Sequence, residues 1–363
     1  MSNLIVEICK IENVQRHNNS DNLDLAQIKG WQVVIKRNEY KDGDKVIFVP
    51  PDSLIPYDLA KKLNVVNYLS IVKSNPEVLK VKAVRLRNEP SYGLLINPSN
   101  VGLEALDVGE SVSEILSITK WEPPTKEMMG NAAPDMPNFH KYTGIENFNN
   151  FPDTIQGDEY VIITEKIHGT NFRCGVVRKP DDMGIMHYEM CAGSHNVRRK
   201  EDPDCLYWKP VLHNLNLNTM IWNTLTVAQY DGKEHDVVVF GEIYGNGVQD
   251  MGYGEAAPTY RLFDISIDGK YLDYSVFKFI CEKYVVPMVP VLWEGYFSKD
   301  KVKELTDGPT TLAPADKITG KFKGREGIVI RLNEERHDRK VGRVILKSVS
   351  ADFHARRGGT DSH

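Results

Sequence analysis

Residues 160–177 read "YVIITEKIHGTNFRCGVV". An apolar run rich in Val and Ile leads up to Lys166, and a second apolar run follows Asn171, which predicts two strands joined by a short turn. His168 stands at that turn beside Gly169, a residue that permits close approach of the backbone. A buried ammonium without a partner is strongly unfavourable, so a lysine at the end of a core strand needs a specific reason. This stretch is therefore the centre of a candidate site.

The chemistry open to Lys166 is that of an amine nucleophile. Lysine attacks only as the neutral amine, and its ordinary pKa of about 10.4 has to fall by about 3 units for that form to dominate near neutral pH. Burial, nearby cations or a metal ion supply such a shift. A lysine in that state attacks a carbonyl carbon or a phosphorus. The simpler alternative is a partly exposed lysine at a hairpin turn.

The whole chain has the composition of an ordinary globular protein. It has 363 residues, of which 41% are hydrophobic and 26% charged, with a net charge of −5, and this length predicts two domains. The first residues mix acid and base in a way that argues against a secretory signal, and no apolar run reaches the roughly 18 residues that cross a membrane. The five cysteines form no CxxC pair, which argues against a disulfide framework or a zinc site. We expect a cytoplasmic protein without membrane association.

The first part of the chain predicts short strands separated by Asn, Asp, Gly and Pro clusters. We expect residues 1–118 to form a small β-barrel of the OB type. The segment "IENVQRHNNSDNLDLAQIKGWQVVI" (residues 11–35) resembles OB-type modules appended to some tRNA-handling enzymes. Alternation in residues 80–87 predicts one strand with a cationic face, suited to contact RNA. Residues 119–153 are dense in Pro, Asn and Gly and predict a linker.

The second part of the chain, residues 154–363, predicts an α+β domain. Strand signals return from Gln156 onwards, and helical patterns lie around residues 207–228 and 274–283. The order of these elements favours mainly antiparallel sheets.

Five motifs in this second part resemble those of ATP-dependent RNA ligases, which belong to the lysine nucleotidyltransferase superfamily. "EKIHGTNF" (165–172) resembles the KxHG type of motif I. The later motifs, in the family's order, are "VVVFGEIYG" (motif III, 237–245), "YRLFDISI" (motif IIIa, 260–267), "REGIVIRL" (motif IV, 325–332) and "RVILKSVS" (motif V, 343–350). The resemblance implies a nucleotidyltransferase domain at residues 154–363, preceded by an N-terminal OB-like module as in one branch of the family.

The resemblance also implies roles for individual residues. Lys166 is expected to attack the α-phosphorus of ATP, Glu326 to position a catalytic Mg²⁺ or Mn²⁺ ion, and Lys347 to contact the α-phosphate. The residues expected to bind ATP are Glu165, Lys166, His168, Asn171, Arg198, Glu242, Phe263 and Lys347. Among them, Glu242 is expected to hold the ribose hydroxyls, Phe263 to stack on the adenine, and Arg198 to contact the ribose or a phosphate.

Three features depart from the pattern or stay open. Motif V often carries K-x-K, but only Lys347 is present, so either Arg343 or another base substitutes or the second contact is absent. The glycine-rich residues 245–254 predict a flexible loop and not a phosphate-binding loop. The segment 317–357 carries an excess of seven positive charges, 12 Lys and Arg against 5 Asp and Glu. That excess is either a solvated surface or a contact with an anionic partner.

The function expected from these motifs is that of an ATP-dependent RNA ligase acting in RNA repair. It joins 3′-hydroxyl and 5′-phosphate RNA ends through a lysine–AMP intermediate and an RNA-adenylate, and we expect a monomer. One alternative is another polynucleotide nucleotidyltransferase, a DNA ligase or a GTP-using capping enzyme. His168, where those groups usually have aspartate, and the short stretch after motif V count against it. The other alternative is a non-catalytic RNA-binding relative, which the presence of Lys166 and Glu326 disfavours.

Overall fold

The computed structural model describes residues 5–122, 131–314, 316–318 and 322–356. Its contacts divide the chain into two compact units. Unit 1 comprises residues 1–125, 145–154 and 348–363, and unit 2 comprises residues 126–144 and 155–347. The stretch 119–153, expected to be a linker, is thus shared between the units, and its residues 123–130 lie outside the described residues. No described helix is long and apolar enough to cross a membrane.

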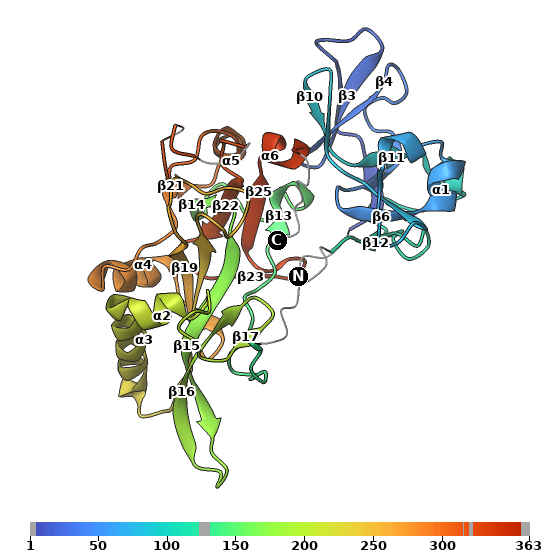
Figure 1. Ribbon diagram of the computed structural model, residues 1–363. Helices are drawn as coiled ribbons and strands as arrows, with labels where there is room; N and C mark the ends of the chain where they lie inside the picture. Colours follow the sequence, from blue (N-terminus) through green and yellow to red (C-terminus); the bar gives the residue numbers. More distant parts are fainter. Residues whose placement is uncertain (1–4, 123–130, 315, 319–321, 357–363) are drawn as a thin grey trace. The chain divides into compact units, whose positions relative to one another are not determined.

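Unit 1 consists mainly of short strands (Figure 1). Its strands are β1 (Glu7–Lys10), β2 (Asn13–Arg16), β3 (Leu23–Ile28), β4 (Trp31–Lys36), β5 (Lys45–Val49), β6 (Ser53–Pro56), β7 (Ser70–Ile71), β8 (Val78–Lys80), β9 (Val84–Leu86), β10 (Glu89–Ser91), β11 (Leu94–Ile96), β12 (Thr119–Lys120) and β13 (Glu146–Asn147). The helices are α1 (Tyr57–Lys62), α6 (Ala351–Ala355) and the 3-10 turns η1 (Val66–Tyr68), η2 (Pro98–Val101) and η4 (Phe148–Asn150). Small sheets form in the orders β1-β5-β11, β2-β3-β4, β12-β6-β8-β7 and β10-β9.

The hairpin of β3 and β4 is fixed by side chains that alternate between inside and outside. Trp31, Val33 and Ile35 are buried in one core cluster, whereas the residues between them are more exposed. The indole nitrogen of Trp31 donates to Asn150 Oδ1 at 2.8 Å, and the Gly30 amide donates to the Asn149 carbonyl at 3.0 Å. A Cβ on Gly30 would lie 2.6 Å from Asn149 Oδ1, so this contact requires glycine. The Gly30–Trp31 pair therefore anchors η4 to the hairpin.

The single cationic strand expected at residues 80–87 is wrong. The structure has two short strands there, β8 and β9, which belong to different sheets. Lys80 forms an ion pair with Asp52 at 2.6 Å and lies 3.3 Å above the centre of the Trp121 ring. Arg85 pairs with Asp352. Lys80 and Arg85 thus lie on different sheets and have separate partners.

Unit 2 is built on longer strands with helices on one side (Figure 1). Its strands are β14 (Tyr160–Lys166), β15 (Thr170–Pro180), β16 (Met186–Ser194), β17 (Arg198–Arg199), β18 (Val237–Tyr244), β19 (Thr259–Ile267), β20 (Lys270–Tyr271), β21 (Val291–Tyr296), β22 (Gly327–Leu332), β23 (His337–Asp338), β24 (Gly342–Arg343) and β25 (Ile345–Val349). The helices are α2 (Lys209–His213), α3 (Leu215–Ala228), α4 (Tyr274–Lys283), α5 (Lys299–Thr306) and the turn η5 (Gln229–Asp231). One sheet has the order β17-β16-β15-β18-β19-β20, and in a second sheet β25, β22, β14 and β21 are successive neighbours.

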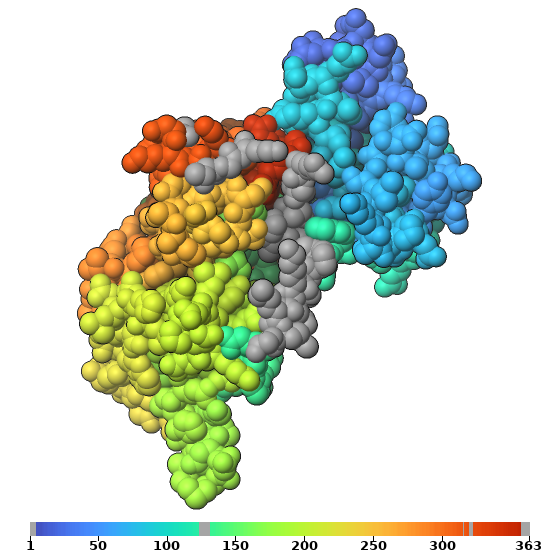
Figure 2. Space-filling model, in the orientation of Figure 1, coloured from blue at the N-terminus to red at the C-terminus, as the bar shows by residue number. Residues whose placement is uncertain are grey.

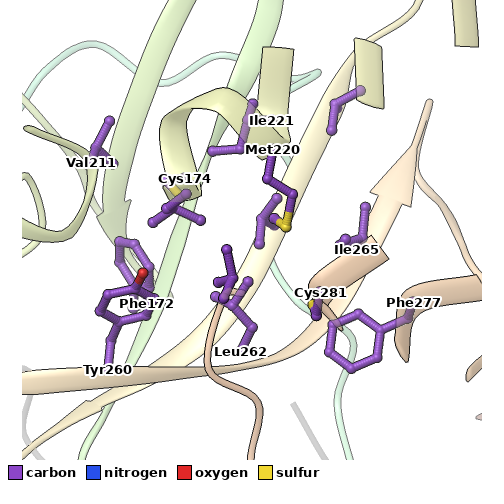
Figure 3. Packing of buried hydrophobic residues seen from close by; sticks show 14 of the residues in the cluster. Phe172, Cys174, Val211, Met220, Ile221, Tyr260, Leu262, Ile265, Phe277 and Cys281 are labelled. Carbon is purple, nitrogen blue, oxygen red and sulfur yellow. The ribbon is translucent and has the colours of Figure 1, made fainter. Parts of the chain in front are cut away.

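One face of the six-stranded sheet packs against α2, α3 and α4 (Figure 3). Alternate residues of β15 and β19, such as Phe172, Cys174 and Leu262, enter this core together with Met220 and Phe277 of the helices. Because strand side chains alternate between faces, the residues between them point to the opposite face. That face carries the candidate site. The other end of the β15–β16 hairpin projects from the body of unit 2, as Figure 2 shows in light green.

A buried ion network joins several elements of unit 2. Asp264, which has no solvent exposure, accepts from Tyr142 Oη at 2.8 Å and pairs with Arg343 at 2.7 Å. Glu335 pairs with Arg343 at 2.6 Å and with Arg331 at 2.8 Å. We call these five residues the Asp264 network. It neutralises part of the positive excess in residues 317–357, of which Lys321 and Arg357 lie outside the described residues.

Candidate active site

Lys166 and Glu326 meet because β14 and β22 pair antiparallel. Lys166 is the last residue of β14 and is opposite Gly327, the first residue of β22, so Glu326 immediately precedes the paired region. Lys166 Nζ donates to Glu326 Oε1 at 2.6 Å, and the two side chains are 16% and 1% exposed. This is a nearly buried charge-assisted contact, in which the lysine is held as an ammonium at the end of a core strand.

His168 links this pair to a neighbouring loop. Its Nδ1 lies 3.4 Å from Glu326 Oε2, and its Nε2 lies 3.0 Å from Asp250 Oδ1. The His168 amide donates to Tyr253 Oη at 2.7 Å. We call Lys166, His168, Glu242, Asp250 and Glu326 the Lys166 cluster. Asp250 and Tyr253 belong to the glycine-rich residues 245–254, so this segment supports the site directly.

Sequence analysis did not assign a role to Asp250, Gln249 or Tyr253. Gln249 Nε2 donates to the Gly169 carbonyl at 3.1 Å, a second contact between the loop and the turn after β14. Burial raises the pKa of the Tyr253 hydroxyl well above its ordinary value, so it stays protonated. The sequence feature that could have indicated their roles is the presence of polar and aromatic side chains between the glycines, because a purely flexible loop does not need them.

Glu242 and Asn171 face each other on adjacent strands. They are directly opposite in the β15–β18 pairing, and the Gly169 amide donates to Glu242 Oε1 at 3.1 Å. A Cβ on Gly169 would overlap the carbonyl oxygen of Ile243, so only glycine permits this approach. Burial raises the pKa of the Glu242 carboxyl to about 8, with the Lys166 ammonium opposing and Glu326 adding to the shift. Asn171 Oδ1 is buried and has no hydrogen-bond partner among the described residues.

Glu165 holds a different segment in place. It is 1% exposed, and its carboxylate accepts from the Thr311 amide at 2.8 Å, from Thr311 Oγ1 at 2.7 Å and from Thr310 Oγ1. These contacts fasten the chain after α5 beside the reactive lysine. They give the Glu165 side chain an anchoring role, and its expected contact with ATP stays a prediction.

Comparison with known proteins identifies the family. A family model described as RNA ligase matches residues 159–349, more than half of the chain. The chain belongs to the RNA ligase family. A second model, described as an OB-fold domain, matches residues 5–98 of this RNA ligase. No curated protein sequence matches at a significant level.

Solved structures of Naegleria gruberi RNA ligase are similar to this RNA ligase over its length. A lysine-to-alanine mutant with ATP and Mn has a TM-score of 0.74 at 21% identity, covering 98% of this chain and 100% of that chain. A glutamate-to-alanine mutant with AMP and Mn has a TM-score of 0.74 at 20% identity, covering 99% and 100%. The form with PPi has a TM-score of 0.72 at 21% identity, covering 97% and 98%. The fold is an OB-fold domain followed by a nucleotidyltransferase domain with antiparallel sheets, as expected from the sequence.

The other expected site residues of this RNA ligase have distinct positions. Phe263 lies in β19 between the core residues Leu262 and Ile265, and its ring contacts Tyr142 edge-on with 4.8 Å between ring centres. Lys347 is 5% exposed in β25, the neighbour of β22 in the sheet. Their contacts with adenine and phosphate stay predictions.

Two arginines of this RNA ligase have structural partners. Arg198 pairs with Glu189 and donates to the Pro134 carbonyl at 3.0 Å, so the structure does not bring it into the Lys166 cluster. Arg343 is bound in the Asp264 network and lies 3.8 Å from the centre of the Tyr271 ring. Arg343 therefore does not replace the second lysine of motif V.

Proposed function

We propose that this RNA ligase uses ATP to adenylylate Lys166 and then joins RNA 3′-hydroxyl and 5′-phosphate ends. The observation that carries the proposal is the nearly buried Lys166 amine, 2.6 Å from Glu326, beside the carboxyl of Glu242. The end of β14 is fixed by its pairing with β22 and by the contacts of His168. The Lys166 amine is therefore kept in one place. Such positioning is a large part of catalysis by phosphoryl-transfer enzymes.

The reaction consists of three transfers at phosphorus. Lys166 loses a proton, its nitrogen bonds to the α-phosphorus of ATP, and the bond to pyrophosphate breaks. An oxygen of the RNA 5′-phosphate then attacks the AMP phosphorus, which breaks the Lys166 N–P bond and gives an RNA-adenylate. Finally the RNA 3′-hydroxyl, losing its proton, attacks the 5′-phosphorus of that RNA-adenylate and AMP leaves.

The residues around Lys166 suit a divalent cation shared with the substrate. Among the described residues no group of three or more His, Cys, Asp or Glu side chains could hold a metal ion by itself. Mg²⁺ commonly binds one or two carboxylates together with substrate phosphates, and the buried Glu326 carboxylate fits this mode. Bound at Glu326, Mg²⁺ or Mn²⁺ would neutralise phosphate charge and favour the neutral amine.

The remaining residues have proposed roles in binding ATP. We propose that Asn171 and Glu242 accept hydrogen bonds from the ribose, a role supported by their directly opposite positions on adjacent strands. His168 orients Glu326, Phe263 stacks on adenine and Lys347 contacts the α-phosphate. We further propose a monomer acting in RNA repair in the cytoplasm, a reducing compartment suited to five free cysteines.

The test is transfer of label from α-labelled ATP to the denatured chain, with GTP in parallel. We expect label from ATP alone, none in Lys166→Ala, and sealing of RNA ends in preference to DNA ends. Label from GTP would instead indicate capping-type chemistry. Unlabelled protein requires a pyrophosphate chase and a mass spectrum, because enzyme purified as the adenylate accepts no further label. If the chase is also negative, the proposal is wrong.

A further inference from the structure

Arg325, the residue before Glu326, is a buried cation, and two of its nitrogens have no hydrogen-bond partner in the part of the chain that the structure describes. It is 7% exposed, and its Nε and Nη1 atoms are buried with no hydrogen-bond partner among the described residues. Arg331, six residues later and 3% exposed, donates to the carbonyls of Phe263 and Leu272 and to Glu335. Arg331 thus has ionic and carbonyl partners, with only its Nε lacking a hydrogen-bond partner, whereas Arg325 lacks a partner for two of its nitrogens among the described residues.

Arg325 lies just before the strand that pairs with the strand of Lys166. Arg325 precedes by two residues Gly327, which pairs with Lys166. The Arg325 amide donates to the Gly308 carbonyl at 2.9 Å. Gly308 has φ +129°, and a Cβ there would lie 3.1 Å from Arg325 Nη2, so glycine lets the backbone lie against the guanidinium.

The segment that lies against Arg325 is itself tied to the strand of the reactive lysine. Two residues after Gly308, Thr310 and then Thr311 bind the carboxylate of Glu165, the neighbour of Lys166 in β14. Arg325 is therefore held by backbone contacts, while two of the nitrogens in its charged group keep their hydrogen-bonding capacity.

A buried guanidinium without a counter-charge among the described residues is unfavourable, so its retention one residue before Glu326 calls for a ligand. Its donors form a planar fork that matches two oxygens of a phosphate. We propose that Arg325 binds a phosphoryl group of the substrates. This rests on the proposed function, because that function brings two candidate phosphates to the site: the leaving pyrophosphate of ATP and the 5′-phosphate of RNA.

The experiment measures thermal unfolding of the full chain with and without anions. The variants are R325M, which keeps the length but removes the charge, and R331M as a matched buried control from the same segment. The probes are inorganic pyrophosphate, and an RNA oligonucleotide carrying either a 5′-phosphate or a 5′-hydroxyl. We expect R331M to lower the midpoint of unfolding, because it removes one of the two arginines that pair with Asp264 and Glu335. R325M is expected to keep the midpoint or raise it, and to lose a stabilising shift seen with the unaltered chain.

The probe whose shift is lost identifies the phosphate. Loss of the pyrophosphate shift assigns Arg325 to ATP, and loss of the difference between 5′-phosphate and 5′-hydroxyl RNA assigns it to RNA. The proposal is overturned if R325M retains both shifts, or if the unaltered chain shows no shift with either probe. It is also overturned if R325M lowers the midpoint of unfolding as R331M does. If R325M does not fold, R325K is the deciding variant, because lysine keeps the charge but lacks the planar fork of donors. Binding of the phosphate probe at least threefold weaker than in the unaltered chain supports the proposal. Equal binding overturns it. These shifts need no catalysis, so a chain that binds phosphate through Arg325 but never forms Lys166–AMP refutes only the proposed function.

Discussion

Unit 2 contains two buried clusters of charged side chains, which differ in how fully their polar atoms are paired. In the Asp264 network, acids and bases pair with one another, and a tyrosine hydroxyl and main-chain carbonyls take up further hydrogen bonds. Beside the Lys166 cluster, buried polar atoms of Asn171 and Arg325 have no partner among the described residues. In the first arrangement every charged side chain has a counter-charge, although Arg331 Nε has no hydrogen-bond partner among the described residues. The second arrangement keeps hydrogen-bonding capacity for a ligand. Equivalent substitutions in the two clusters should therefore have opposite consequences for stability and activity.

The largest effect is expected from Glu326→Gln. The amide keeps the shape of the side chain but removes the charge that faces Lys166 Nζ and that would bind a divalent cation. We expect formation of the Lys166–AMP adduct to fall by about 100-fold or more, since a group that stabilises the transition-state charge is worth that order of rate. The measurement is single-turnover labelling with α-labelled ATP. A rate within threefold of the unaltered chain would contradict the role of Glu326.

The converse result is expected from Asp264→Asn. Asp264→Asn removes one of the two buried carboxylates that pair with Arg343, so the free energy of unfolding of unit 2 should fall by about 3 kcal/mol. Folded protein at low temperature should still form the adduct at a rate close to that of the unaltered chain. Urea unfolding measures the first quantity and single-turnover labelling the second. The control is Asp268→Asn, a partly exposed member of a surface ion pair, for which a change of about 1 kcal/mol or less is expected.

The sequence predicted the strands of unit 2 well because hydrophobic patterning dominates there. The strand expected to lead up to Lys166 is β14, and the helix expected around residues 274–283 is α4, with these same bounds. Patterning failed at residues 80–87, where alternating Lys and Arg suggested one strand. The break between β8 and β9 at residues 81–83, and the separate partners of Lys80 and Arg85, are not encoded in that alternation.

The candidate site was predictable only in part for a similar reason. Motif spacing identified Lys166, Glu242 and Glu326, each of which lies on or next to a regular strand. The contributions of Asp250, Tyr253 and Thr311 come from segments without regular structure. Long-range contacts alone decide which of their side chains reach the strands. Arg343, which the sequence left open as a substitute for the second lysine of motif V, pairs with Asp264 and Glu335 in the structural network.

An intermediate effect, which depends on pH, is expected from Glu242→Gln. The folded carboxyl has its pKa raised to about 8, whereas the unfolded value is about 4.3. Between these values the folded state binds more protons than the unfolded state, so the free energy of unfolding falls as pH rises from about 4.5 to about 8. Because glutamine does not titrate, Glu242→Gln should abolish this decrease in the free energy of unfolding.

We expect the unaltered chain to lose about 2 kcal/mol relative to Glu242→Gln across that range, a value reduced by residual solvent and by the nearby ammonium of Lys166. Urea unfolding at pH 5, 6.5 and 8 gives the two curves. Glu304→Gln, an exposed change on α5, serves as control and should run parallel to the unaltered chain. Parallel curves for Glu242→Gln as well would show that the carboxyl is ionised in the folded state.

The smallest effect, and the finest test of the comparison, is expected from Asp250→Ala. Its side chain is 64% exposed, so its loss should leave stability within about 0.5 kcal/mol. It nevertheless accepts the hydrogen bond that orients His168, and His168 in turn lies against Glu326. Groups that orient a reacting side chain through one intermediary commonly change rates by about tenfold. We expect adduct formation to slow by about that factor, with Asp250→Asn, which keeps an acceptor oxygen, nearer to the unaltered rate. Asp182→Ala in the exposed β15–β16 hairpin is the control. An unchanged rate in Asp250→Ala would show that the residues of the paired strands suffice for adduct formation and that the glycine-rich loop does not contribute to it through Asp250.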